Sequence, residues 1–299
     1  MKKRIVSTLA MTPLLLLVYM GGVALWCLAI IVSIIGIHEF CNGWNKISVH
    51  PSKMICYVMT ILLFSTYILV YLTNDAEIYA SNLVNVWLFV SVATSLIYGW
   101  QINKRTPYDT IATIASLVYI PFFIYHIILI DTIHHLFVWI VIIAALGSDV
   151  FAYFTGRLLG KHKLAPNLSP KKTIEGAIGG LIGSSLLSWL FGYIFMKEMT
   201  TMCLFLGFIG GLAGIAGDLT ASAFKRKFRI KDFSNLIPGH GGVLDRFDSV
   251  MFAAPVIYYL MRIIWKYDPL FKECAWLFYF FIYTLKKHKP NTKFFELCW

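Results

Sequence analysis

Residues 9–37 read LAMTPLLLLVYMGGVALWCLAIIVSIIGI, and no charged residue interrupts them. A helix needs about 20 apolar residues to cross a bilayer, so this stretch is long enough for more than one crossing. It follows a basic start at residues 1–4, as a secretory signal would, but it is too long for one and has no clear small-residue cleavage site. We therefore predict two retained transmembrane helices with a tight turn near Gly21 and Gly22.

The rest of the chain is also rich in apolar residues and poor in charged ones. Of its 299 residues, 59% are hydrophobic and only 14% are charged, which is too little charge to cover the surface of a soluble domain. We predict an all-α, polytopic integral membrane protein with about nine transmembrane helices. The expected spans are 5–20, 23–41, 54–72, 80–99, 109–130, 135–156, 173–196, 202–224 and 247–267.

The basic residues test this topology. If the N-terminus is cytosolic, the segments on its side carry 18 Lys and Arg residues, whereas the opposite loops before the last span carry only Lys197. This asymmetry is the positive-inside pattern and favours a cytosolic N-terminus. Topology therefore explains the net charge of +11 first, and anionic lipid or phosphate substrates second; no nucleic-acid partner is expected.

One transmembrane domain, 1–267, is the simplest organisation, with its chemistry concentrated in 148–250. The tail 268–299 contains an apolar segment at 276–285 that is too short to cross, so its role and side stay open. None of the six cysteines forms a Cys-x-x-Cys pair, and most lie in or beside apolar runs. We interpret them as packing residues, without a disulfide or zinc site.

The densest polar stretch runs from Gly217 to Asp248. Asp218 lies inside an apolar span, where a carboxylate is costly unless it faces water, a cation or a partner. On a helix, Ser222 and Lys225 follow it at i+4 and i+7 and share its face, with Arg226 beside them. The alternative is that Asp218 makes a single hydrogen bond between helices that pack through glycines.

Asp245 and Asp248 are spaced i, i+3 at the expected start of the last span, after a glycine-rich loop around His240. Such a loop brings backbone N–H groups close to phosphates, although it could be an ordinary connection and the carboxylates could be helix caps. With the basic run 225–231 between them, Asp218 and the later pair suit an oxygen-ligated Mg²⁺ site. Metal and fixed cations would offset the repulsion between two phosphorylated substrates.

A second polar stretch runs from Ser148 to Gly176. Asp149 is expected inside a span, and Lys171 and Lys172 are candidates for holding phosphates. Thr173 is expected to cap the next span. The alternative is a positively charged loop followed by a capped helix.

These residues resemble the bacterial phosphatidate cytidylyltransferase (CDP-diacylglycerol synthase) family. Its carboxy-proximal signature is present without departure as Ser222-x-Phe224-Lys225-Arg226, Lys231-Asp232-x-Ser234 and Ile237-Pro238-x-His240-Gly241-Gly242-Val243-x-Asp245-Arg246-Phe247-Asp248. The upstream region matches from Ser148-Asp149 to Ser169-Pro-Lys-Lys-Thr, except that Val150-Phe151 replaces the more usual Thr-Gly. The resemblance covers about 1–267 and excludes the tail.

The resemblance implies that CTP and phosphatidate give CDP-diacylglycerol and pyrophosphate, with Mg²⁺ and a potassium ion as cofactors. It implies a homodimer in the bacterial inner membrane, with the active site facing the cytosol. The catalytic residues that we expect are Asp218, Lys225, Arg226, Asp245 and Asp248, with Asp218 and Asp245 as metal ligands. The expected substrate-binding residues are Ser222, Lys231, Asp232, His240, Gly241, Gly242, Arg246, Lys171 and Lys172.

Two other functions remain open at this stage. A polyprenyl-phosphate transferase would share the membrane carboxylates and Mg²⁺ but would depend on a UDP-sugar. A transporter of phosphorylated solutes is disfavoured, because transporters often carry broken helices in both halves, whereas the polar residues here gather at one end. No Walker A, GxGxxG, HExxH or Gly-x-Ser-x-Gly motif is present.

Overall fold

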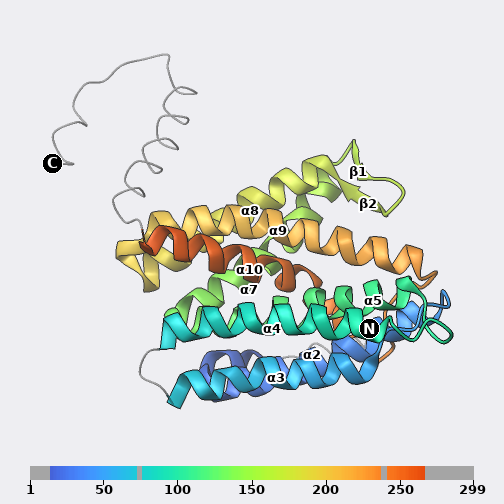
Figure 1. The fold of residues 1–299 in the computed structure, drawn as a ribbon. Coiled ribbons are helices and arrows are strands. Elements are labelled where there is room, and N and C mark those ends of the chain that lie inside the picture. The colour runs from blue at the N-terminus through green and yellow to red at the C-terminus, as the bar shows by residue number, and fades with distance from the viewer. Residues whose placement is uncertain (1–13, 73–75, 237–240, 267–299) are drawn as a thin grey trace, which may run out of the picture. The chain divides into compact units, whose positions relative to one another are not determined.

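A computed structural model describes residues 14–72, 76–236 and 241–266. The chain divides into two compact units, Met1–Tyr258 and Tyr259–Trp299. The described residues are mainly helical (Figure 1). The helices are α2 Gly22–Asn45, α3 Lys53–Leu72, α4 Ala76–Tyr98, α5 Pro107–Leu117, α6 Phe123–Ile133, α7 Leu136–Leu159, α8 Ile174–Phe195, α9 Thr200–Lys227 and α10 Leu244–Lys266, with a short 3-10 turn at Lys197–Met199.

The helices confirm the all-α membrane fold. Six helical segments among the described residues are long and apolar enough to cross a membrane: Gly22–Asn45, Pro107–Ile133, Leu136–Leu159, Ile174–Phe195, Lys197–Lys227 and Leu244–Ile264. Two more, α3 and α4, contain shorter apolar stretches at Lys53–Ile68 and Asn82–Tyr98. With α9 taken from Thr200, the helices match eight expected spans to within four residues at each end.

The remaining expected span, 5–20, begins outside the described residues, and its described part, 14–20, is helical. The count of nine and the side of the N-terminus therefore stay predictions. The tail 268–299 lies outside the described residues. The two-helix turn near Gly21 has its expected backbone, because Gly21 and Gly22 have φ of 61° and 51°, a region that glycine enters without steric cost.

The expected span 109–130 is one helical segment with a defect in its middle. Between α5 and α6, residues Val118–Phe122 form a π-helical turn that contains Pro121. Proline has no N–H to donate, and its ring displaces the carbonyl one turn earlier. The wider turn accommodates both effects, as π-bulges do in other helices.

Glycines and small residues let α7, α8 and α9 pack closely. A Cβ on Gly180 of α8 would lie 2.7 Å from the Ser148 carbonyl oxygen of α7, and one on Gly211 of α9 would lie 2.4 Å from Ser184 Oγ of α8. Larger residues would separate these helices. The close packing places the polar ends of α7 and α9 beside each other.

A short hairpin joins α7 to α8, where the sequence predicts only a connecting loop. Strands β1 (Lys163–Ala165) and β2 (Ser169–Thr173) are antiparallel, with Lys163 opposite Thr173. Thr173 then caps α8 as predicted, because its Oγ1 accepts the N–H of Gly176 at 3.1 Å. The hairpin carries Lys171 and Lys172.

An aromatic cluster fastens the end of α9 to α2. Phe40 of α2 is fully buried, and its ring contacts those of Phe224 and Phe228 of α9 at centroid distances of 4.9 and 5.7 Å. Phe233, in the segment after α9, and Tyr119, in the π-helical turn, join the same cluster. Large aromatic side chains bury much apolar area, so this cluster anchors the segment that leads from α9 to α10.

Candidate active site

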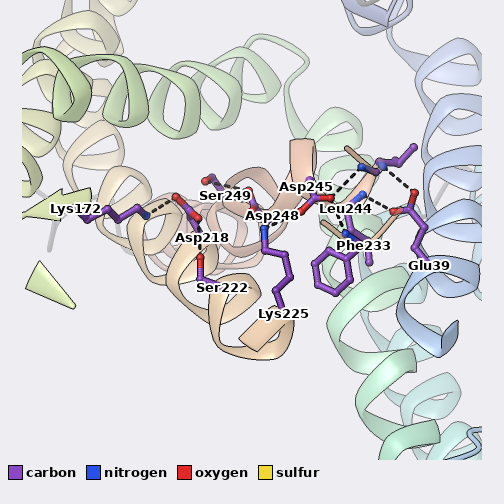
Figure 2. A network of polar contacts seen from close by, with 12 residues as sticks. Glu39, Lys172, Asp218, Ser222, Lys225, Phe233, Leu244, Asp245, Asp248 and Ser249 are labelled. Carbon is purple, nitrogen blue, oxygen red and sulfur yellow. Dashed lines mark hydrogen bonds and ion pairs between the residues drawn. The ribbon is translucent and has the colours of Figure 1, made fainter. Parts of the chain in front are cut away.

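The C-terminal half of α9 presents Asp218 and Ser222 on one face. Ser222 Oγ donates to Asp218 Oδ1 at 3.5 Å, and the other oxygen of Asp218 forms an ion pair with Lys172 of β2 (Figure 2). Lys172 reaches Asp218 because the hairpin lies against the start of α8. The structure thus joins the two polar stretches that the sequence analysis treated separately.

Asp245, in the first turn of α10, is held by three donors. One of its oxygens accepts from Lys225 Nζ at 2.7 Å, and the other accepts the backbone N–H groups of Phe233 and Gly242, each at 2.9 Å. Its side chain is only 2% exposed. Asp245 therefore holds the described parts of the connection between α9 and α10, 228–236 and 241–243, and neutralises Lys225.

Gly241 is needed beside Asp245. Its φ is +84°, and a Cβ there would lie 2.9 Å from Asp245 Oδ2. A side chain would strain the backbone and press on the carboxylate. His240 and Pro238 lie outside the described residues, so the expected role of His240 stays a prediction.

Glu39 of α2 holds the opposite side of the same loop, and the sequence analysis did not include it. Its buried carboxylate accepts Ser234 Oγ at 2.5 Å and the N–H groups of Val243 and Leu244 at 2.9 Å each. Figure 2 shows it beside the start of α10. These N–H groups have no partner within the helix, so Glu39 caps α10 from a distant segment. We call Glu39 and Asp245 the loop clamp.

Asp149 of α7 and Asp248 of α10 meet across Ser249. Asp248 Oδ1 accepts the N–H of Ser249 at 2.8 Å, and Ser249 Oγ lies 3.4 Å from Asp248 Oδ1 and 3.3 Å from Asp149 Oδ2. Asp218 is within electrostatic range of both carboxylates. We call Asp149, Asp218 and Asp248 the acidic cluster.

Two cavities border the acidic cluster and share Asp149 in their lining. The first, of about 470 Å³, is walled mainly by aliphatic side chains and ends at Asp149, Asp245, Arg246 and Asp248. The second, of about 430 Å³, is lined by Asp149 and Asp218 and by the basic residues Arg157, Lys171 and Lys172. An apolar space and a cationic space therefore meet at carboxylates.

The remaining predicted residues lie on the exposed side of this arrangement. Arg226 is exposed, and its Nε donates to the Leu168 carbonyl oxygen in the hairpin turn at 3.3 Å. Lys231 and Asp232 are exposed in the segment 228–236, and Arg246 is exposed at the end of the apolar cavity. They surround the carboxylates without binding them.

A divalent cation has oxygen ligands available here. Mg²⁺ is bound by one or two carboxylates together with water and substrate phosphates. The acidic cluster supplies carboxylates bordering both cavities, with hydroxyl groups of Ser222 and Ser249 nearby. Among the described residues no three His, Cys, Asp or Glu side chains form a group that could hold a metal ion.

Comparison with known proteins identifies the family. A model of the cytidylyltransferase family matches residues 2–264. A phosphatidate cytidylyltransferase of Staphylococcus haemolyticus is 34% identical over 266 residues, which cover 86% of this chain and 96% of the relative. The chain belongs to the cytidylyltransferase family.

Other relatives of this cytidylyltransferase match a shorter region. A phosphatidate cytidylyltransferase of Bacillus subtilis is 43% identical over 125 residues, which cover 39% of this chain and 44% of the relative. An uncharacterized Escherichia coli protein, YnbB, is 40% identical over 116 residues, which cover 39% of each chain.

Sequence reasoning listed many of the residues that the structure brings together here, but it paired Asp248 with Asp245, whereas the structure links Asp248 to Asp149 through Ser249. It recognised Asp149 as a carboxylate inside a span without counting it among the site residues. It also passed over Glu39, although a lone carboxylate in an apolar helix was a usable signal. The expected metal role of Asp245 stays a prediction, because in this structure both of its oxygens bind donors of the protein.

Proposed function

We propose that this cytidylyltransferase transfers CMP from CTP to phosphatidate, which yields CDP-diacylglycerol and pyrophosphate. The observation that carries the proposal is the acidic cluster at the junction of an apolar cavity and a cationic cavity. A reaction between a lipid and a nucleotide requires both kinds of space within reach of one reacting phosphorus. The names of two relatives as phosphatidate cytidylyltransferases support the same reaction.

In the proposed reaction, an oxygen of the phosphatidate phosphate attacks the α-phosphorus of CTP. A phosphorus–oxygen bond forms there while the bond from the α-phosphorus to the oxygen bridging to the β-phosphate breaks, and pyrophosphate leaves with that electron pair. The attacking oxygen is already ionised, so no general base is needed. The barrier comes largely from bringing anions together, which positioned cations lower.

The lysines of the site are placed for this task. Lys172 lines the cationic cavity and pairs with Asp218, so an entering phosphate competes for its ammonium group. Lys171 lines the same cavity. We assign phosphate binding to these two residues and to Lys225, Arg226 and Arg246. Ser222, Lys231, Asp232, His240, Gly241 and Gly242 would shape the nucleotide site and its loop.

The acidic cluster would hold Mg²⁺, with K⁺ as a second cation. Bound there, the metal would neutralise phosphate charge and favour attack at the phosphorus. Asp149, Asp218 and Asp248 would orient it, whereas Asp245 holds Phe233 and Gly242 on either side of the connection between α9 and α10. In this proposal the metal ligands are the acidic cluster, which borders both cavities, in place of the pair Asp218 and Asp245 expected from the sequence.

We further propose a bacterial inner-membrane location, a cytosolic active site and a homodimer. The concentration of Lys and Arg in alternate segments supports the orientation. A cysteine introduced as Lys163→Cys in β1 should react with a membrane-impermeant thiol reagent from the cytosolic side only. Reaction from the opposite side would contradict it, and mass measurement in detergent tests the dimer.

The function is tested with the purified full chain, labelled CTP and phosphatidate. We expect pyrophosphate and labelled CDP-diacylglycerol only when both substrates and Mg²⁺ are present. Sugar-phosphate transfer from a UDP-sugar to polyprenyl phosphate, with no reaction of CTP, would instead identify the alternative transferase. Uptake of phosphorylated solute into vesicles without turnover would identify a transporter.

A further inference from the structure

Two helical stripes, one on α2 and one on α7, line the apolar cavity together with residues of α6 and α10. On α2, Leu25, Leu28, Ala29 and Val32 line it, at the spacing i, i+3, i+4 and i+7 of one helical face. The stripe on α7 consists of Val138, Val141, Ile142 and Leu146. The volume of about 470 Å³ is within the range of roughly 300–1,000 Å³ that is usual for ligand pockets.

The α7 stripe leads directly to the acidic cluster. Asp149 follows Leu146 by three residues and Ile142 by seven, so it continues the same face. At 1.5 Å per residue the stripe from Val138 to Asp149 is roughly 16 Å long. The cavity therefore begins at the reacting groups and extends along an apolar wall.

The lining of the cavity fits an occupant with an apolar body, and its charged end holds Arg246 beside Asp149, Asp245 and Asp248. An anionic head at that end would face these carboxylates as well as Arg246, so it would need the cation that the proposed function places at the acidic cluster. Arg246 is the one Lys or Arg among the described residues that line it, and it stands at the carboxylate end. An aliphatic wall neither attracts nor solvates a nucleotide, because burying unpaired polar groups is costly. CTP accordingly fits the cationic cavity and not this one.

The cavity also differs from the lipid-facing exterior of α2. Leu25 and Ala29 are 3% and 4% exposed, whereas Ile31 on the opposite face is 55% exposed. Leu25 and Ala29 thus face the interior of the helix bundle, whereas Leu146, at the α7 end of the lining, is 46% exposed.

We propose that an acyl chain of phosphatidate lies in this cavity between α2 and α7, with its phosphate at Arg246. The inference rests on the proposed function and adds to it the part of the protein that binds the acyl chain of the lipid substrate. Because the wall is long and aliphatic, it contributes binding energy only to a lipid whose chain reaches along it.

The test fills the cavity and compares two substrates. Ala29→Trp and Leu146→Trp each place a large ring in the cavity, and Ile31→Trp is the matched control on the exposed face of α2. We expect kcat/KM for dioleoyl phosphatidate to fall about tenfold in the two cavity variants, the scale of an overpacked site, while that for dihexanoyl phosphatidate stays within about twofold. Ile31→Trp should leave both values unchanged.

The short-chain substrate reports folding and chemistry within the same variant. The decisive quantity is kcat/KM for dioleoyl phosphatidate divided by kcat/KM for dihexanoyl phosphatidate. If both cavity variants had the same ratio as the unaltered protein, because both values fell equally or neither fell, the acyl-chain assignment would be overturned. Failure of the unaltered protein to convert either phosphatidate with CTP would instead overturn the proposed function.

A second measurement does not depend on substitution. Phosphatidate carrying a photoreactive diazirine in its acyl chain should label peptides from 25–32 and 138–146, and unlabelled phosphatidate should compete. Labelling confined to other helices, or equal competition by phosphatidylcholine, would show that the cavity takes bulk lipid only and would contradict the proposal.

Discussion

The acidic cluster and the loop clamp contain the same chemical group in opposite settings. Asp218 is 26% exposed and borders a cavity, whereas Asp245 and Glu39 are each 2% exposed and bind three protein donors apiece. A carboxylate with free lone pairs can bind a cation or substrate, but one whose oxygens are occupied can only hold structure. The number of carboxylate oxygens already bound to protein donors therefore distinguishes the two groups, since Asp248 of the acidic cluster is also buried, at 8% exposure.

The largest expected effect is on the acidic cluster. Asp218→Asn removes the charge that faces the cationic cavity, and we expect CTP-dependent pyrophosphate release to fall about a hundredfold to a thousandfold, as when one transition-state stabilising group is lost. The thermal unfolding temperature should stay close to that of the original protein. Glu198→Gln, which alters an exposed carboxylate in the turn before α9, is the control and should retain full activity.

For the loop clamp we expect the reverse, a loss of stability first and a loss of activity as its consequence. Glu39→Ala leaves two N–H groups and one hydroxyl without their acceptor. At the usual cost of about 1–3 kcal/mol per group, we expect the free energy of unfolding to fall by at least about 3 kcal/mol. Activity should fall with it because α10 loses its cap. Glu39→Gln keeps one acceptor oxygen and should lose less, measured by thermal unfolding in detergent. If the unaltered protein, Glu39→Ala and Glu39→Gln had equal unfolding temperatures, Glu39 would not stabilise the fold, and the loop clamp would not differ from the acidic cluster in this respect.

The dependence of activity on Mg²⁺ tests which carboxylates belong to the acidic cluster. Asp149→Asn should raise the Mg²⁺ concentration needed for half-maximal activity about tenfold, the lower end of the effect of altering a metal environment. Excess Mg²⁺ should restore much of the rate. If Asp245→Asn shifted the Mg²⁺ midpoint and Asp149→Asn did not, the metal would belong with Asp245 after all.

The smallest effect is expected at the glycine beside the clamp. Gly241→Ala puts a Cβ into a positive-φ backbone and 2.9 Å from Asp245 Oδ2, which should cost about 1–2 kcal/mol. We expect a modest fall in unfolding temperature together with a higher KM for CTP. Gly22 also has a positive φ, but a Cβ there would meet nothing within 4 Å. Gly22→Ala therefore measures the cost of the backbone conformation alone, without a steric contact with a carboxylate.

The helices were predictable from the sequence, and so were some local contacts within the candidate site. Apolar length marks a transmembrane helix in any context, so 135–156 and 173–196 became α7 and α8 almost unchanged. The i, i+4 spacing likewise set Ser222 against Asp218 correctly. The hairpin β1–β2 was missed because its short strands carry lysines and a proline and show no alternation of apolar residues.

Which carboxylates act together was not predictable from local spacing. Asp245 and Asp248 are three residues apart and looked like a pair, yet Asp245 turns to Lys225 and the connection between α9 and α10 while Asp248 meets Asp149 from another helix. Glu39 reaches α10 across more than 200 residues of sequence. Helical periodicity describes faces of one helix and contains no information about the neighbour that a face will meet.

By itself, the sequence determined the class of protein, the helices and the residue types of the reaction, because hydropathy and charge act locally along the chain. Tertiary structure alone decided that three carboxylates from α7, α9 and α10 border two cavities of opposite character and that two others hold a loop. The physical reason is that helix packing sets which oxygens stay open to a ligand and which are occupied by N–H groups.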